Sequence, residues 1–160
     1  MAAGGNGRGD VRSGAEVLVV VAVPSPQPLR FDQLAGSRVP IHTSAMGKCL
    51  LAFAPSLPGT GIDVLRGLPR LARFTDRTIT RRDRLAAELQ QTRNRGWALN
   101  DEERNPGVRA VAVPVLDAAG SAVAAVAVQG PATRLPDDRL QVVARRIADL
   151  SEDLGPMLAR

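Results

Sequence analysis

The stretch GVRAVAVPVLDAAGSAVAAVAVQG, residues 107–130, constrains the fold more than any other part of the chain. It contains two runs rich in valine and alanine, and the four residues 117–120 between them have the composition of a hairpin loop. Pro114 cannot donate to a β-ladder, so it predicts an edge or a bulge in the first run. A further short strand, WALND at residues 97–101, comes just before this hairpin.

Four helices are predicted around these strands. A hydroxyl at Thr43 or Ser44 caps the first helix, which ends at Pro55 and Pro58 and carries apolar Met46, Leu50, Leu51 and Phe53. The segment GIDVLRG, residues 61–67, predicts a shorter helix that Gly67 ends.

Two longer helices follow in the second half of the chain. Thr80 opens one, with Asp83 as an approximate capping-box partner, and Gly96 closes it. Pro136 starts the other, and Gly155-Pro156 ends it. The apolar stripe predicted for this last helix consists of Leu140, Val143, Ile147, Leu150 and Leu154.

The order of the elements decides the fold class. Residues 17–23 form a β-branched run that predicts a strand covered on both faces, and residues 1–14 are glycine-rich and predict a flexible tail. A hairpin and consecutive helices interrupt any regular strand–helix alternation. The sequence therefore predicts an α+β fold in which helices pack on an antiparallel sheet, with residues 15–160 forming one domain.

Composition excludes several classes of protein. The net charge is +5, but the arginines alternate with acids and there are few aromatic residues, which favours a solvated mixed-charge surface over a nucleic-acid surface. Cys49 is the only cysteine and His42 the only histidine, so neither a disulfide framework nor a metal site is expected. No run reaches the roughly 18 apolar residues of a membrane span, and a cytoplasmic protein without a cofactor is expected.

The segment VPIHTSAMGKCLLAF, residues 39–53, invites comparison with a phosphate-binding loop because Gly47-Lys48 stands at the start of a helix. The loop signature requires glycine where this chain has His42, and serine or threonine where it has Cys49. A small enzyme using His42, Ser44 or Lys48 remains as an alternative. That hypothesis lacks partner residues for a catalytic triad, so no catalytic residue is assigned.

Although the segment does not fit a phosphate-binding loop, it could still bind an anion at the start of its helix. Backbone amides at a helix start favour a carboxylate or another anion. Small side chains at Thr43, Ser44, Ala45 and Gly47 would leave those amides accessible. The purely structural alternative is that Ser44 caps the helix and Gly47 permits close packing.

The same segment resembles the P-[LM]-H-x-[ST]-A-x-G-K-x-x-L-A signature of the effector-binding domain of IclR-family transcriptional regulators. Three further segments resemble the family in the same order: residues 74–80, 85–117 and 125–135. The resemblance implies a curved antiparallel sheet flanked by helices, related to GAF domains. It also implies a small organic effector, often a carboxylic or aromatic acid, and a homodimer or homotetramer. The family's N-terminal winged helix-turn-helix is absent from this chain, so DNA contact is expected only through that missing domain.

The resemblance also places the effector site. It implies that the amides of Ala45 and Met46, between Ser44 and Gly47, meet an effector carboxylate. It implies a floor and a return strand formed by Asn100, Ala110, Ala127 and Gln129. Only Asn100 and Gln129 are polar among these four, which favours a larger, less polar ligand or no ligand. The leading hypothesis is a sensing and oligomerisation domain, and the alternative is an interaction module whose pocket Met46 fills.

Overall fold

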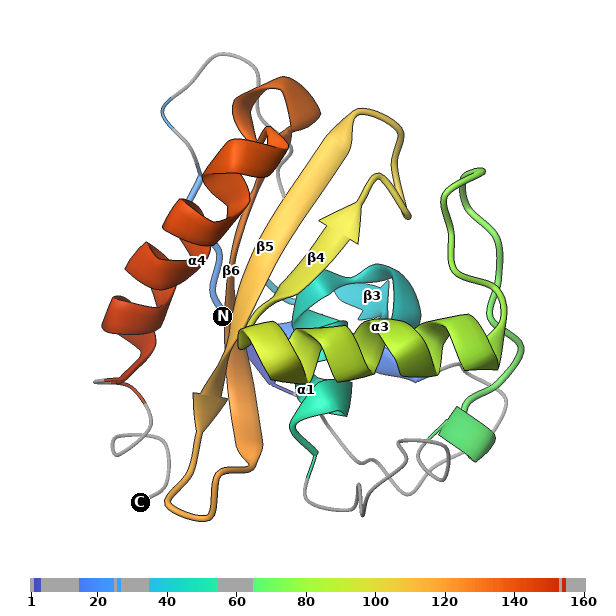
Figure 1. Ribbon diagram of the computed structural model, residues 1–160, viewed down its shortest axis with the longest axis horizontal. Helices are drawn as coiled ribbons and strands as arrows, with labels where there is room; N and C mark the ends of the chain where they lie inside the picture. Colours follow the sequence, from blue (N-terminus) through green and yellow to red (C-terminus); the bar gives the residue numbers. More distant parts are fainter. Residues whose placement is uncertain are drawn as a thin grey trace.

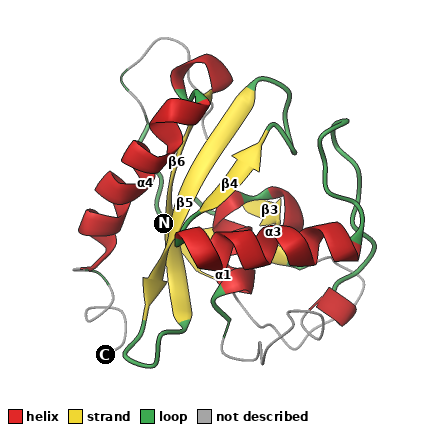
Figure 2. Cartoon of the chain, viewed as in Figure 1, coloured by secondary structure: helices red, strands yellow, loops and turns green. Residues whose placement is uncertain are grey.

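The computed structural model describes residues 2–3, 15–24, 26, 35–54, 65–152 and 154. Six strands form one sheet in the order β3-β2-β1-β6-β5-β4, and every neighbouring pair is antiparallel. Helices lie on both faces of this sheet (Figures 1 and 2). The α+β prediction is confirmed. The strands are β1 (Ala2–Ala3), β2 (Glu16–Val19), β3 (Arg38–Pro40), β4 (Ala98–Asp101), β5 (Val108–Leu116) and β6 (Ala122–Pro131).

The predicted hairpin is the centre of the sheet. β5 and β6 pair along almost their whole length, and Asp117 organises the turn by accepting the amides of Ala119 and Ser121, each at 2.9 Å. Pro114 pairs with Ala125 beyond the point where β4 has ended, so its missing amide costs no ladder bond with β4. The edge interpretation of Pro114 is therefore correct.

The first part of the chain differs from expectation at two points. Ala2 and Ala3 form β1 between β2 and β6, so the flexible-tail prediction for residues 1–14 is wrong for these two residues. Residues 4–14 lie outside the described part. The predicted strand 17–23 ends at Val19, and the valines at 20, 21 and 23 are exposed rather than covered. β-branched composition alone did not reveal where pairing stops.

Helix α1 (Ala45–Ala52) begins where the sequence predicts, with Ser44 as its N-cap. All eight of its residues are buried, which is the pattern of a helix enclosed on every side. Its side chains pack against β4, β5 and β6 on one side and against α3 on the other. The predicted stops at Pro55 and Pro58, and residues 61–64 of the predicted short helix, lie outside the described residues.

Helix α3 (Arg82–Arg95) starts one residue later than predicted. Its N-cap is Arg81, with no side-chain capping bond, so neither Thr80 nor the expected capping box opens this helix. Gly96 ends the helix in the left-handed conformation at φ 84°, as the sequence predicts. Arg93 donates to the carbonyl of Ala52, which is an unpaired group at the end of α1.

Helix α4 (Asp137–Glu152) covers the opposite face of the sheet (Figure 1). The predicted stripe is partly wrong, because Leu150 is 70% exposed whereas Ala144 and Ser151 are buried. Leu140 and Ile147 do face the sheet, where they join Val111 and Val113 in a separate core cluster. Two other large apolar residues of the helix, Val142 and Leu150, are exposed. The predicted stop at Gly155-Pro156 lies outside the described residues.

Candidate functional site

The start of α1 leaves two backbone donors without an acceptor inside the helix. Ser44 is extended at φ −105° and its Oγ accepts the amide of Gly47 at 3.3 Å. The amides of Ala45 and Met46 are the first two of the helix, and these positions have no acceptor within the helix itself. The Ser44 cap therefore satisfies the third amide, that of Gly47, and the amides of Ala45 and Met46 remain without an acceptor in the helix.

Gly47 has a packing role. A Cβ at this position would lie 2.1 Å from the carbonyl oxygen of Ile41, in the 3-10 turn η1 (Ile41–Thr43). No side chain fits there without moving backbone. Glycine thus allows the turn before α1 to fold tightly against the first turn of the helix.

The four predicted sheet residues lie on one face. Asn100, Ala110 and Gln129 pair in one row across β4, β5 and β6, and Ala127 lies in the next row on the same face. Ala110 shares a core cluster with Ala45 and Met46, and Ala127 packs at its edge. The structure therefore brings the start of α1 and this face of the sheet together, as the resemblance implied.

A buried ion pair adjoins these residues. The ammonium of Lys48 lies 2.5 Å from Oε1 of Glu103, and the two residues are only 1% and 4% exposed. Glu103 also donates its backbone amide to Oδ1 of Asn100 at 3.0 Å, and its Oε1 accepts the amide of Asp101 at 3.3 Å. The end of β4 is thus bound to the middle of α1.

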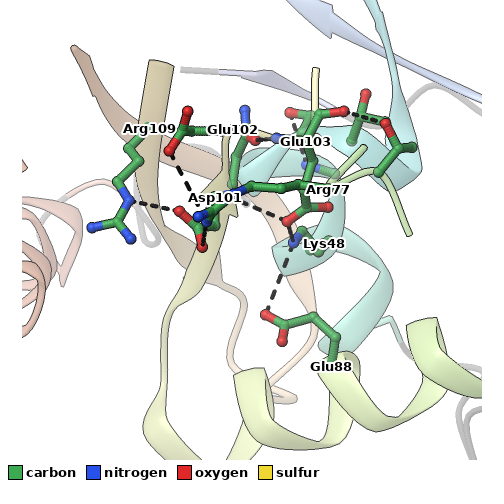
Figure 3. A network of polar contacts seen from close by, with 12 residues as sticks. Lys48, Arg77, Glu88, Asp101, Glu102, Glu103 and Arg109 are labelled. Atoms are coloured by element: carbon green, nitrogen blue, oxygen red, sulfur yellow. Dashed lines mark hydrogen bonds and ion pairs between the residues drawn. The ribbon is translucent and has the colours of Figure 1, made fainter. Parts of the chain in front are cut away.

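Figure 3 shows Lys48 between Glu103 and a second carboxylate, Glu88 of α3. The distance from Nζ to Oε1 of Glu88 is 3.9 Å. Glu88 in turn accepts from Arg95 at 2.7 Å, and the guanidinium of Arg95 stacks over the ring of Trp97. This chain of charges joins the loop after β4 to α1 and α3. In the sequence, Lys48 suggests only a phosphate-binding loop or the enzyme alternative. Sequence spacing carries no signal for a pair 55 residues apart.

The three consecutive acids at residues 101–103 each bind different partners within the protein. Asp101 accepts from Arg77 and from Arg109, both at 2.6 Å. Glu102 has a positive φ of 57° and accepts the amide of Gly107. The hydrogen bond to Asp101 is the main cause that raises the pKa of Arg109 above its ordinary value. All three acids therefore organise the protein itself.

The three residues that the enzyme alternative requires, His42, Ser44 and Lys48, all have hydrogen-bond or ion-pair partners within the protein. The Nε2 atom of His42 lies 3.0 Å from the carbonyl oxygen of Ala72, and Ser44 and Lys48 have the partners described above. Burial raises the pKa of the Cys49 thiol to about 12, so this sulfur is not a nucleophile near neutral pH. Within the described residues no group of three or more histidine, cysteine and acidic side chains is arranged to hold a metal ion, and no helix is long and apolar enough to cross a membrane.

The fold and the comparison with known families define the class of the domain. A family model described as the C-terminal domain of the bacterial transcriptional regulator IclR matches residues 10–155. This class is the effector-binding domain of transcriptional regulators. The chain belongs to the IclR family.

Individual relatives agree with this assignment. The chain is 38% identical over 147 residues to the HTH-type transcriptional regulator BhcR of Paracoccus denitrificans, covering 91% of this chain and 51% of that protein. Among solved structures, the Thermotoga maritima IclR matches with a TM-score of 0.81 at 27% identity, covering 93% of this chain and 59% of that one. A double mutant of the inducer-binding domain of PobR from Acinetobacter, solved with 3-hydroxybenzoic acid, matches with a TM-score of 0.61 at 28% identity, covering 82% of this chain and 81% of that one. The chain spans about half the length of the relatives it matches in sequence.

Proposed function

We propose that this domain senses a small organic acid at the start of α1 and passes the signal to a DNA-binding domain of the same regulator. The observation that carries the proposal is the position of the Ala45 and Met46 amides. They begin a buried helix and share a core cluster with Ala110 of the facing sheet. Helix-start amides and the helix dipole favour a carboxylate.

The residues on the facing sheet indicate what the ligand carries besides its carboxylate. Alanines at 110 and 127 offer an apolar surface, and the amides of Asn100 and Gln129 lie in one row with Ala110 between them. An acid with an apolar body and a second polar group suits this arrangement better than a very small polar acid. The 3-hydroxybenzoic acid named for the double mutant of the PobR domain has this general form.

Coupling to DNA requires that the ligand change how subunits are arranged. A ligand shifts such an equilibrium only by its differential affinity for the two states. We infer a cytoplasmic homodimer or homotetramer in which occupation of the site favours one arrangement of subunits. The charge chain from Glu103 through Lys48 to Glu88 links the site to α3 and supplies a rigid route for such a shift.

A thermal-shift screen tests the sensing proposal. Benzoate, 3-hydroxybenzoate, phthalate and a series of aliphatic mono- and dicarboxylates would each be added to the folded domain. An acid present at 100 times its dissociation constant raises the free energy of unfolding by about 2.7 kcal/mol. A shift with one acid and none with its amide or methyl ester supports a carboxylate site. No shift with any acid at millimolar concentration contradicts the proposal.

One observation favours a second candidate, an interaction module without a ligand. Met46 is only 6% exposed and belongs to the same core cluster as Ala110, so its side chain already occupies part of the layer. Under this hypothesis the wild-type domain is an oligomer by light scattering and ignores every acid. Met46→Ala would then create space and an acid response that the wild type lacks, whereas under the sensing proposal the wild type already responds.

A further inference from the structure

The side chain of Asn100 has a defined polarity. Its Oδ1 lies 3.0 Å from the backbone nitrogen of Glu103. A backbone amide can only donate, so the atom facing it must be the carbonyl oxygen of the carboxamide and not its NH2 group. The Nδ2 donors therefore point away from the Glu103 amide.

Glu103 is held from two directions. Its carboxylate is bound by Lys48 of α1 at 2.5 Å, and its carbonyl oxygen accepts from Oγ1 of Thr78 at 2.6 Å. The same Thr78 hydroxyl accepts the amides of Phe74 and Thr75. The backbone amide that orients Asn100 is thus fixed by a buried ion pair on one side and by the 74–78 loop on the other.

Asn100 belongs to the sheet row that faces the start of α1. Asn100 is 5% exposed and shares the sheet row with Ala110, which contacts the core cluster at the start of α1. Gln129 stands at the other end of the same row. A row of three strands spans roughly 9–10 Å between its outer residues, which is the width of a small organic molecule.

We propose that Glu103, anchored by Lys48, is a positioning residue that sets the polarity of Asn100 and so decides which ligand group the site accepts. Asn100 presents N–H donors to the ligand. The site then takes an acid whose second polar group is a hydrogen-bond acceptor, such as a carboxylate or a carbonyl oxygen, and disfavours one that carries an ammonium there. This inference rests on the proposed acid-sensing function.

The orientation of Asn100 is tested without a ligand. In the 15N,13C-labelled domain, a hydrogen bond from the Glu103 amide to the Asn100 side chain gives a through-bond correlation between that nitrogen and the Asn100 Cγ. We expect the correlation in the wild type. We expect it to weaken or vanish in the double variant Lys48→Met, Glu103→Leu, which removes both charges and retains the backbone amide at position 103. A wild type without the correlation, or a double variant that keeps it unchanged, overturns the positioning role.

Ligand selectivity is tested with two matched pairs of probes. Isophthalate is compared with 3-(aminomethyl)benzoate, and succinate with β-alanine, because each pair shares one carboxylate and differs in the second group. We expect the wild type to bind the dicarboxylate of a pair at least about tenfold more tightly, the effect of one hydrogen bond to a charged group. Asn100→Asp keeps an oxygen for the Glu103 amide and replaces the donor by an acceptor, so the preference should reverse.

The control and the possible outcomes distinguish a failure of the selectivity inference from a failure of the acid site itself. Asn105→Asp adds the same charge at an exposed position in the same loop and should leave the preference as in the wild type. Equal binding of both probes, or a preference unchanged in Asn100→Asp, overturns the selectivity inference while leaving the acid site intact. If neither probe of either pair binds, the acid site fails and the selectivity fails with it, whereas the NMR correlation still decides the orientation.

Discussion

The ammonium of Lys48 lies 2.5 Å from the carboxylate of Glu103 in the interior of the domain, and this contact binds the middle of α1 to the loop that follows β4. Each charge of the pair offsets the cost of burying the other, because either one alone would be buried without a partner. The lysine that first suggests a phosphate-binding loop is consequently unavailable to a phosphate. Its charge is used to hold the wall of the candidate site.

Breaking this pair from one side should be severe. Lys48→Met leaves the Glu103 carboxylate buried and unpaired, and should lower the free energy of unfolding by about 3–5 kcal/mol. The double variant Lys48→Met, Glu103→Leu should recover most of that loss. Urea denaturation of the four proteins in the cycle measures the coupling, and single and double variants of equal stability would contradict a buried pair.

Gly47 should not tolerate a side chain. A Cβ would lie 2.1 Å from the Ile41 carbonyl oxygen, so Gly47→Ala must displace the turn before α1. We expect a loss of about 1–3 kcal/mol or more, typical of overpacking. Gly130→Ala is the matched control, because nothing lies within 4 Å of a Cβ there. Thermal melts in which the two variants lose equal stability would refute the packing role.

Ser44 should contribute as a helix cap. Ser44→Ala removes the acceptor of the Gly47 amide and should cost about 1 kcal/mol, whereas Ser44→Thr, which keeps the hydroxyl, should cost less. Chemical denaturation compares the two variants. A Ser44→Ala protein as stable as the wild type would show that the 3.3 Å bond contributes nothing.

Local signals in the sequence predicted those features that depend on neighbouring residues. The cap at Ser44, the left-handed Gly96 and the turn at Asp117 all follow from side chains that bond or bend their own backbone. The exposed Leu150 and the missing cap at Thr80 were mispredicted, because tertiary packing decides which face of a helix is buried and where its first turn begins.

The candidate site was predictable only in outline. The family pattern implied Asn100 and Gln129, and sheet register explains why they share a face. The role of Glu103 depends on contacts with Lys48 and Thr78, which lie 55 and 25 residues away along the chain. No spacing rule connects such residues, so the orientation of Asn100 required the folded structure.

Cys49 should link stability to pH at the alkaline end. Burial raises the pKa of its thiol from 9.0 to about 12, so the folded state holds the proton more tightly than the unfolded state. The resulting stability is complete below pH 9 and is lost as the pH rises toward 12. Cys49→Ala should therefore show a shallower loss of stability than the wild type across this range. A thiol reagent at pH 8 should modify the wild type only after unfolding, and rapid modification of the folded protein would contradict the burial.

The central claim is that the first amides of α1 bind an acid, and one substitution removes a single donor from them. Ala45→Pro deletes the Ala45 N–H at a helix position that proline favours, after a residue that is already extended. Ala45→Val adds comparable bulk and keeps the N–H. Calorimetric titration with the best acid of the screen should show binding to the wild type and to Ala45→Val, and a loss of about tenfold or more in Ala45→Pro. Equal affinity of the proline and valine variants, with both folded, would contradict the claim that these amides hold the ligand.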